Sequence, residues 1–208
     1  MEIDVLIVGQ GLAGSLLAWE LAGRGLAVCV VDNELCNASR VAAGLVNPVS
    51  GRRLVLQPNI AGLLPAARHC YGRLARFFGD QFFVERPMWK ILSGPAQKQQ
   101  TERRLQQAEY AEYLQAIDVG GHGVVAPFGI LHQLQTGYLK TEALLDALRT
   151  WLLASGAYRQ AEFDYALCAW SRICAGATSS PNASYSAKAT WRRPIPGSAA
   201  CRFNLQRA

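Results

Sequence analysis

Three glycines and one aspartate near the start of the sequence have the types and spacing needed to bind a dinucleotide. The run Gly9-Gln10-Gly11-Leu12-Ala13-Gly14 is followed, 18 residues after its last glycine, by Asp32. The first glycine permits a tight turn, the second lets backbone N–H groups approach a pyrophosphate, and the third lets a helix pack closely on a strand. The Asp32 carboxylate would accept hydrogen bonds from the adenosine ribose and would repel a 2′-phosphate, which argues against NADP.

The elements needed to position these residues can be read on both sides of the glycine run. Residues 3–8 are apolar and rich in β-branched side chains, as in a buried parallel strand, and residues 27–31 form a second run of this kind ending at Asp32. Between them, residues 15–24 have apolar side chains at helical spacing, and Gly25 is suited to end that helix. Strand, glycine turn, helix and strand make one Rossmann-type βαβ unit. A glycine turn without a ligand in another α/β domain is the alternative, and the pattern alone does not separate FAD from NAD.

A second segment carries a family resemblance. The run Ala38-Ser39-Arg40-Val41-Ala42-Ala43-Gly44-Leu45-Val46-Asn47-Pro48 resembles the FAD-dependent oxidoreductases of the D-amino-acid oxidase and glycine oxidase superfamily. The glycine run also fits this superfamily, although glutamate is more usual at the place of Asp32. Gly137-Tyr138-Leu139 is similar to a family segment that precedes a long helix, and Lys140 departs from the acid often found there. The resemblance covers roughly residues 1–167.

The resemblance implies a FAD enzyme that oxidises an amine or an amino acid. A hydride would pass from the carbon bearing nitrogen to flavin N5, and the reduced flavin would pass electrons to oxygen or to another acceptor. It assigns no catalytic residue. The alternative for Arg40 is a solvated loop charge. The residues expected to bind the cofactor are Gly9, Gln10, Gly11, Leu12, Ala13, Gly14, Asp32, Asn33, Ser39, Arg40, Ala43, Gly44 and Leu45.

The substrate is less well defined by the sequence. Arg52 and Arg53 could hold a substrate carboxylate, because guanidinium groups bind carboxylates through two parallel hydrogen bonds, or they could be a surface pair. A small-molecule amine or amino acid is the expected partner. Relatives could also include the flavin domain of a tRNA-modifying enzyme, in which case the amine is on RNA. Two further alternatives are a non-catalytic NAD- or FAD-binding module and, least favoured by the sequence, a nucleic-acid-binding protein.

Hydrophobic periodicity and turn residues predict the rest of the fold. The expected class is α/β, with a FAD-binding Rossmann part at 1–80, part of an inserted α+β substrate domain at 81–137, and a return to the FAD domain at 138–167. The expected elements are an irregular segment at 37–58, a helix at 60–78, strands at 82–86 and 89–92, a helix at 96–116, a glycine loop at 120–123, strands joined by a turn at 124–134, a helix from a Thr141 cap to about Ala154, and a strand at 160–167.

Cysteine spacing and hydropathy exclude several classes. None of the 6 cysteines has CxxC spacing and the 3 histidines do not cluster with them, which argues against zinc and favours reduced thiols. The acidic start Met-Glu-Ile-Asp does not resemble a secretory signal, and no apolar run is long enough for a membrane span. We therefore expect a cytoplasmic location. The oligomeric state cannot be read from the sequence.

The basic excess of the chain lies in its last segment. Residues 1–167 hold 15 basic and 15 acidic residues, whereas residues 168–208 hold 6 basic residues and no acidic one, which accounts for the net charge of +6. A basic arm for nucleic acid and a flexible tail are two interpretations of this irregular segment.

A third interpretation of the tail is that it is translated out of frame. Read from the last base of each codon, with allowed third bases, residues 183–189 can become VIFCEGY and residues 195–208 can become NPWFRCLPFQPAKG. The first string resembles a buried strand entering a glycine turn. We therefore hypothesise a frameshift near residues 168–172 that truncates a longer flavoenzyme. A chain truncated in this way would lack the later strands of its sheet and would leave a sheet edge exposed. We therefore expect poor solubility, weak FAD retention and impaired activity.

Overall fold

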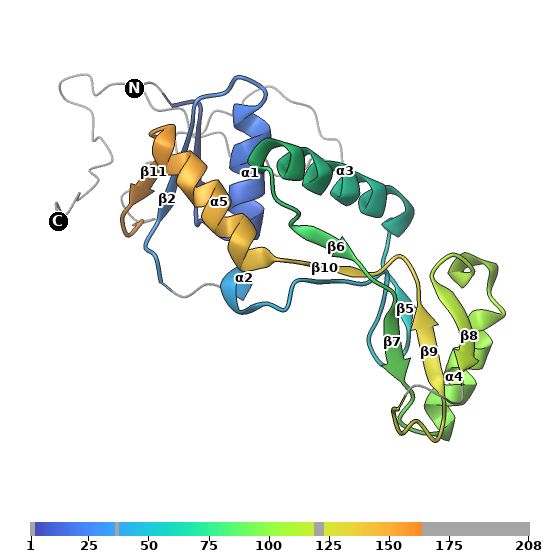
Figure 1. Cartoon of the computed structure of the whole chain (residues 1–208). Coiled ribbons are helices and arrows are strands. Elements are labelled where there is room, and N and C mark those ends of the chain that lie inside the picture. Colours follow the sequence, from blue (N-terminus) through green and yellow to red (C-terminus); the bar gives the residue numbers. More distant parts are fainter. Residues whose placement is uncertain (1–2, 36–37, 119–122, 164–208) are drawn as a thin grey trace, which may run out of the picture. The chain divides into compact units, whose positions relative to one another are not determined.

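The computed structural model describes residues 3–35, 38–118 and 123–163, and the structural statements below concern these residues. They divide into two compact units, which are described separately (Figure 1). The first unit takes residues up to Val41 and from Leu144 onward, and the second takes Ala42–Ala143. The domain limits predicted from the sequence, at residues 80, 137 and 167, stay a prediction. The predicted tail at 168–208 lies outside the described residues.

The first unit is built on a three-stranded parallel sheet with the order β1-β2-β11. β1 (Val5–Val8) and β2 (Val28–Asp32) are joined through α1 (Leu12–Ala22), and β11 (Tyr158–Gln160) pairs with β2 in parallel. The predicted βαβ unit is therefore confirmed. β2 is the central strand, which explains why its valines and Cys29 are buried on both faces.

Two helices cover this sheet with apolar side chains. In α5 (Thr141–Ala154), buried leucines recur at the spacing of a helix face that packs on a core. The core of the first unit combines residues of β1, α1, β2, α5 and β11, namely Ile7, Ala18, Val28, Val30, Leu152 and Tyr158. The short helix α2 (Ala38–Val41) belongs to the same unit.

The second unit contains two small antiparallel sheets, a short hairpin and two longer helices. One sheet has the order β3-β10-β6, from β3 (Leu45–Val46), β10 (Gly137–Leu139) and β6 (Phe83–Glu85). The other has the order β7-β9-β8, from β7 (Met88–Ile91), β9 (Ile130–Gln133) and β8 (Leu114–Asp118). The hairpin and helices are β4 (Val49–Ser50), β5 (Val55–Leu56), α3 (Ile60–Phe78) and α4 (Pro95–Leu105).

The helix predicted at 96–116 is wrong beyond its first half. α4 ends at Leu105, a short 3₁₀ turn follows at Ala108–Tyr110, and β8 begins at Leu114. Tyr110 and Tyr113 have helical spacing, but both are buried in the core of the second unit, and Leu114 pairs with Gln133 of β9. Tertiary pairing therefore replaces the local helical preference.

Smaller corrections concern element ends. Only Ile130–Gln133 of the segment 124–134 is a strand, because a turn in which the Gly129 N–H donates to the Ala126 carbonyl (2.9 Å) precedes it. The strand predicted at 160–167 begins earlier, because β11 spans Tyr158–Gln160 and residues 161–163 are not in a strand; the rest of the predicted range lies outside the described residues. Thr141 begins α5 instead of capping it, and its hydroxyl donates to the Leu139 carbonyl at 3.2 Å.

The described residues offer neither a membrane-spanning helix nor a cluster of metal ligands. No helix among them is both long and apolar enough to cross a membrane. The same residues contain no group of three or more His, Cys, Asp or Glu side chains arranged to hold a metal ion.

Candidate dinucleotide site

The glycine turn leaves β1 and enters α1 in a conformation that its residue types explain. Gly9 has a φ of +97°, which L side chains rarely adopt, and its N–H donates to the Val31 carbonyl at 2.7 Å. A Cβ at Gly14 would lie 2.2 Å from the Gly9 carbonyl oxygen and 3.2 Å from Ile7 Cγ2. Gly14 therefore permits the close approach of helix and strand that the motif predicts.

The N-terminus of α1 receives its cap from a distant serine. The first N–H groups of a helix have no carbonyl of a preceding turn to donate to. Here the Leu12 N–H donates to Ser39 Oγ at 3.0 Å, from α2. A Cβ at Gly11 would lie 3.3 Å from the same Oγ, so Gly11 keeps this approach open. Ala13 and Gly14 belong to the same first turn of α1, and a helix N-terminus is a place where an anion is favoured.

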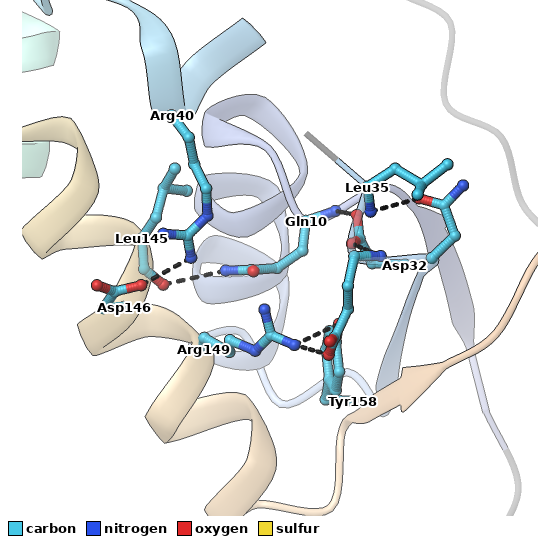
Figure 2. Close-up of polar contacts among 10 residues, drawn as sticks. Gln10, Asp32, Leu35, Arg40, Leu145, Asp146, Arg149 and Tyr158 are labelled. Atoms are coloured by element: carbon cyan, nitrogen blue, oxygen red, sulfur yellow. Dashed lines mark hydrogen bonds and ion pairs between the residues drawn. The ribbon is translucent and has the colours of Figure 1, made fainter. Parts of the chain in front are cut away.

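The carboxylate of Asp32, at the end of β2, is held by two backbone N–H groups. Oδ2 accepts from the Gln10 N–H at 2.6 Å, and Oδ1 accepts from the Glu34 N–H at 2.7 Å (Figure 2). Neighbouring Asn33 is exposed, and its Oδ1 accepts from the Leu35 N–H at 3.2 Å. The structure thus places Asp32 beside the glycine turn, whereas the side chain of Asn33 serves the local turn.

The side chain of Gln10 fixes the glycine turn to α5. It is 2% exposed, and its Nε2 donates to the Leu145 carbonyl at 3.0 Å (Figure 2). The same Nε2 donates to Ser15 Oγ at 3.3 Å. A buried amide needs such partners, because leaving it unpaired would cost about 1–3 kcal/mol. Sequence reasoning assigned Gln10 to the cofactor without detecting this second role.

Arg40 forms an ion pair rather than standing as a solvated loop charge. Its Nη2 lies 2.7 Å from Oδ1 of Asp146 on α5, and the two side chains are 28% and 58% exposed (Figure 2). A pair with this much exposure contributes about 0–1 kcal/mol to stability. The cofactor role expected of Arg40 stays a prediction.

Three of the predicted cofactor residues, Ala43, Gly44 and Leu45, belong to the second unit. Gly44 has a φ of +68°, and a Cβ there would lie 2.1 Å from the Leu139 carbonyl oxygen. A glycine is therefore required at this position by the fold itself. Ala43 and Leu45 are exposed, and so are Arg52 and Arg53, which lie in the turn of the β4–β5 hairpin.

Sequence reasoning missed a polar cluster next to Asp32. Arg149 of α5 forms an ion pair with Glu34, donates to the Tyr158 hydroxyl at 3.1 Å, and lies over the Tyr158 ring at 4.9 Å. Burial raises the pKa of Tyr158, and the nearby Arg149 guanidinium opposes that shift. The one signal in the sequence was the charged side chain of Arg149 among the leucines of α5.

The residues of the first unit fit a bound dinucleotide. The α1 N-terminus suits a pyrophosphate, since its N–H groups and its helix dipole both favour negative charge. The Asp32 carboxylate lies beside the same turn, as a ribose acceptor requires. The roles of individual residues toward the cofactor stay predictions.

A comparison with protein families shows to which family the chain belongs. The family model described as FAD dependent oxidoreductase (DAO) matches residues 4–162. The chain belongs to this family. It is therefore a FAD-dependent oxidoreductase by family, with FAD as the cofactor and the dinucleotide fold that the glycine motif predicts.

The matches between this FAD-dependent oxidoreductase and individual relatives cover only part of the chain. One relative is the tRNA 5-methylaminomethyl-2-thiouridine biosynthesis bifunctional protein MnmC of Psychrobacter cryohalolentis. The two sequences are 31% identical over 90 residues, and this match covers 40% of this chain and 12% of that protein. Two solved glycine oxidases share the fold of this chain. The one from Geobacillus kaustophilus has a TM-score of 0.61 and 20% identity, over 75% of this chain and 45% of that chain. The one from Bacillus cereus has a TM-score of 0.56 and 22% identity, over 76% and 46%. The chain thus spans less than half the length of these proteins.

Proposed function

We propose that the chain carries the FAD-binding part of an enzyme that oxidises an amine or an amino acid. The observation that carries the proposal is the glycine turn, in which Ser39 and Asp32 are both hydrogen-bonded within a chain that belongs to a FAD-dependent family. Bound FAD supplies a two-electron acceptor for the hydride lost from the substrate carbon that bears nitrogen.

The proposal gives specific residues a role in binding FAD or the substrate. The N–H groups of Ala13 and Gly14 donate to the pyrophosphate, and Ser39 keeps the N-terminus of α1 capped. Asp32 accepts from the ribose hydroxyls and rejects a 2′-phosphate by charge repulsion. Arg52 and Arg53 are the candidates for a substrate carboxylate, because the guanidinium fork matches that group.

A titration of the purified chain tests the cofactor part of the proposal. We expect FAD to raise the thermal midpoint, although with the weak affinity that the exposed sheet edge predicts. NAD is expected to bind more weakly than FAD, and NADP most weakly, because only NADP carries the phosphate that Asp32 repels. Binding of NAD with no response to FAD would favour the NAD-binding module instead. Binding of neither would overturn the proposal.

The substrate part of the proposal is tested by adding candidate substrates to the FAD-loaded chain. Bleaching of flavin absorbance on anaerobic addition of amino acids or secondary amines would identify the reducing substrate. The resemblance to MnmC favours a second candidate, an amine carried on tRNA. Reduction by modified tRNA but not by free amines would select this candidate, and reduction by free amino acids alone would reject it.

A further inference from the structure

A cluster of three side chains lies beside the loop that follows β2, and no role toward the cofactor has been assigned to it. Glu34 comes from that loop, Arg149 from α5 and Tyr158 from β11. Arg149 forms an ion pair with Glu34, and the Tyr158 hydroxyl donates to Glu34 Oε1 at 3.2 Å. Figure 2 shows the Arg149 side chain pointing toward the end of the Tyr158 side chain. Both partners of Glu34 lie far from it in the sequence.

The backbone of Glu34 connects the cluster to Asp32. Its N–H donates to Asp32 Oδ1 at 2.7 Å, while its φ is +61°. This left-handed conformation costs a non-glycine residue about 1–2 kcal/mol, so it persists only where other contacts hold it. The contacts of the Glu34 carboxylate with Arg149 and Tyr158 supply that restraint.

The cluster is too exposed to solvent for its ion pair to add much to the stability of the fold. The side chains of Arg149 and Glu34 are 25% and 32% exposed, a range in which an ion pair contributes little to global stability. The cluster has a larger effect on the position of Asp32 than on stability, because the Asp32 carboxylate accepts one N–H from the glycine turn and one from the restrained loop. The orientation of the Asp32 carboxylate therefore depends on both elements.

We propose that Glu34, Arg149 and Tyr158 are positioning residues that orient the Asp32 carboxylate toward the 2′-hydroxyl of the adenosine ribose. The inference rests on the proposed function, since it concerns the ribose end of the FAD site. It assigns to α5 and β11, which follow the glycine turn by more than a hundred residues, a share in nucleotide discrimination.

The test compares two nucleotides that differ at one hydroxyl. ADP and 2′-deoxy-ADP are titrated into the full chain by calorimetry, and the ratio of their dissociation constants is the readout. Wild type is expected to prefer ADP, because only ADP has the hydroxyl that Asp32 accepts. Tyr158→Phe and Arg149→Met are expected to lower this preference by about threefold to tenfold, the net contribution of one ordinary hydrogen bond.

Matched variants separate positioning from general stability. Arg159→Met removes an exposed guanidinium that donates to the Gly156 and Tyr158 carbonyls, and it is expected to leave the ADP preference unchanged. Arg149→Lys keeps the charge beside Glu34 and is expected to restore part of the preference. Thermal midpoints are measured for all variants.

The outcomes distinguish this inference from the proposed function. Equal weakening of both nucleotides, or an unchanged ratio in Tyr158→Phe and Arg149→Met, would overturn the positioning role while FAD binding by wild type stands. A wild-type chain that prefers neither nucleotide would also overturn the positioning role. A wild-type chain that binds neither FAD nor ADP would overturn the proposed function and this inference together.

Discussion

The backbone N–H of Gln10 donates to Oδ2 of Asp32 across 2.6 Å, so the glycine turn and the end of β2 form one hydrogen-bonded unit. The contact connects the phosphate-binding part of the predicted site to its ribose-binding part. A change at either residue is therefore expected to alter the position of the other.

Asp32→Asn is expected to weaken FAD binding by about tenfold or more, because a charged acceptor that receives two N–H groups becomes an amide. The discrimination against NADP is expected to fall as well, since the repelling charge is gone. Fluorescence titration measures both. Asp4→Asn is the control: its carboxylate accepts the Ala27 N–H at 2.8 Å before β1 begins, and FAD affinity should not change.

Gly14→Ala is expected to lower the free energy of unfolding by about 1–3 kcal/mol, because the added Cβ overpacks the turn. That Cβ would lie 2.2 Å from the Gly9 carbonyl oxygen. Gly72→Ala in α3 meets nothing within 4 Å and should stabilise the chain by about 0.5–1 kcal/mol. Urea unfolding of the two variants checks the difference, and equal stabilities would contradict it.

Ser39→Ala is expected to cost about 1 kcal/mol of stability, the usual loss when a helix N-cap hydroxyl is removed. The hydroxyl accepts the Leu12 N–H at 3.0 Å, so the loss should fall on α1. Hydrogen exchange should then accelerate at Leu12. Unchanged protection at that amide would show that Ser39 does not cap the helix in solution.

Stability is expected to decrease in alkaline solution through two buried groups. Burial raises the pKa of Cys29 and of Tyr158 above their ordinary values of 9.0 and 10.0. Because the folded state holds these protons more tightly, the stabilisation is complete below the ordinary values and is lost as pH rises through the raised ones. Urea midpoints from about pH 8 to about pH 11 measure this loss. Tyr158→Phe should reduce the slope without removing it.

The hypothesis of a shifted frame predicts a specific result from the gene. Resequencing near the codons of residues 168–172 should find an inserted or missing base, and correction should yield VIFCEGY in place of residues 183–189. An intact single frame, with relatives that share this basic tail, would end the hypothesis.

The sequence predicts elements well where local pattern and tertiary structure agree. α3 spans Ile60–Phe78 as its periodicity predicts, and the glycine turn lies between β1 and α1. The helix expected at 96–116 fails because Leu114 pairs with Gln133, a contact that no local pattern encodes. The same reason hides the partnership of Glu34 and Tyr158, which are 124 residues apart.

The hydrogen bond from the buried Gln10 amide to the Leu145 carbonyl, between residues 135 positions apart, also bears on synthesis. Translation proceeds from the N-terminus, so the glycine turn leaves the ribosome long before its partner on α5 exists. Closing so long a loop is slow, because the chain entropy is lost before the contact forms. A nascent chain that ends before α5 therefore lacks the partner of the Gln10 amide, and the proposed nucleotide site is expected to be complete only after α5 and β11 have been synthesised.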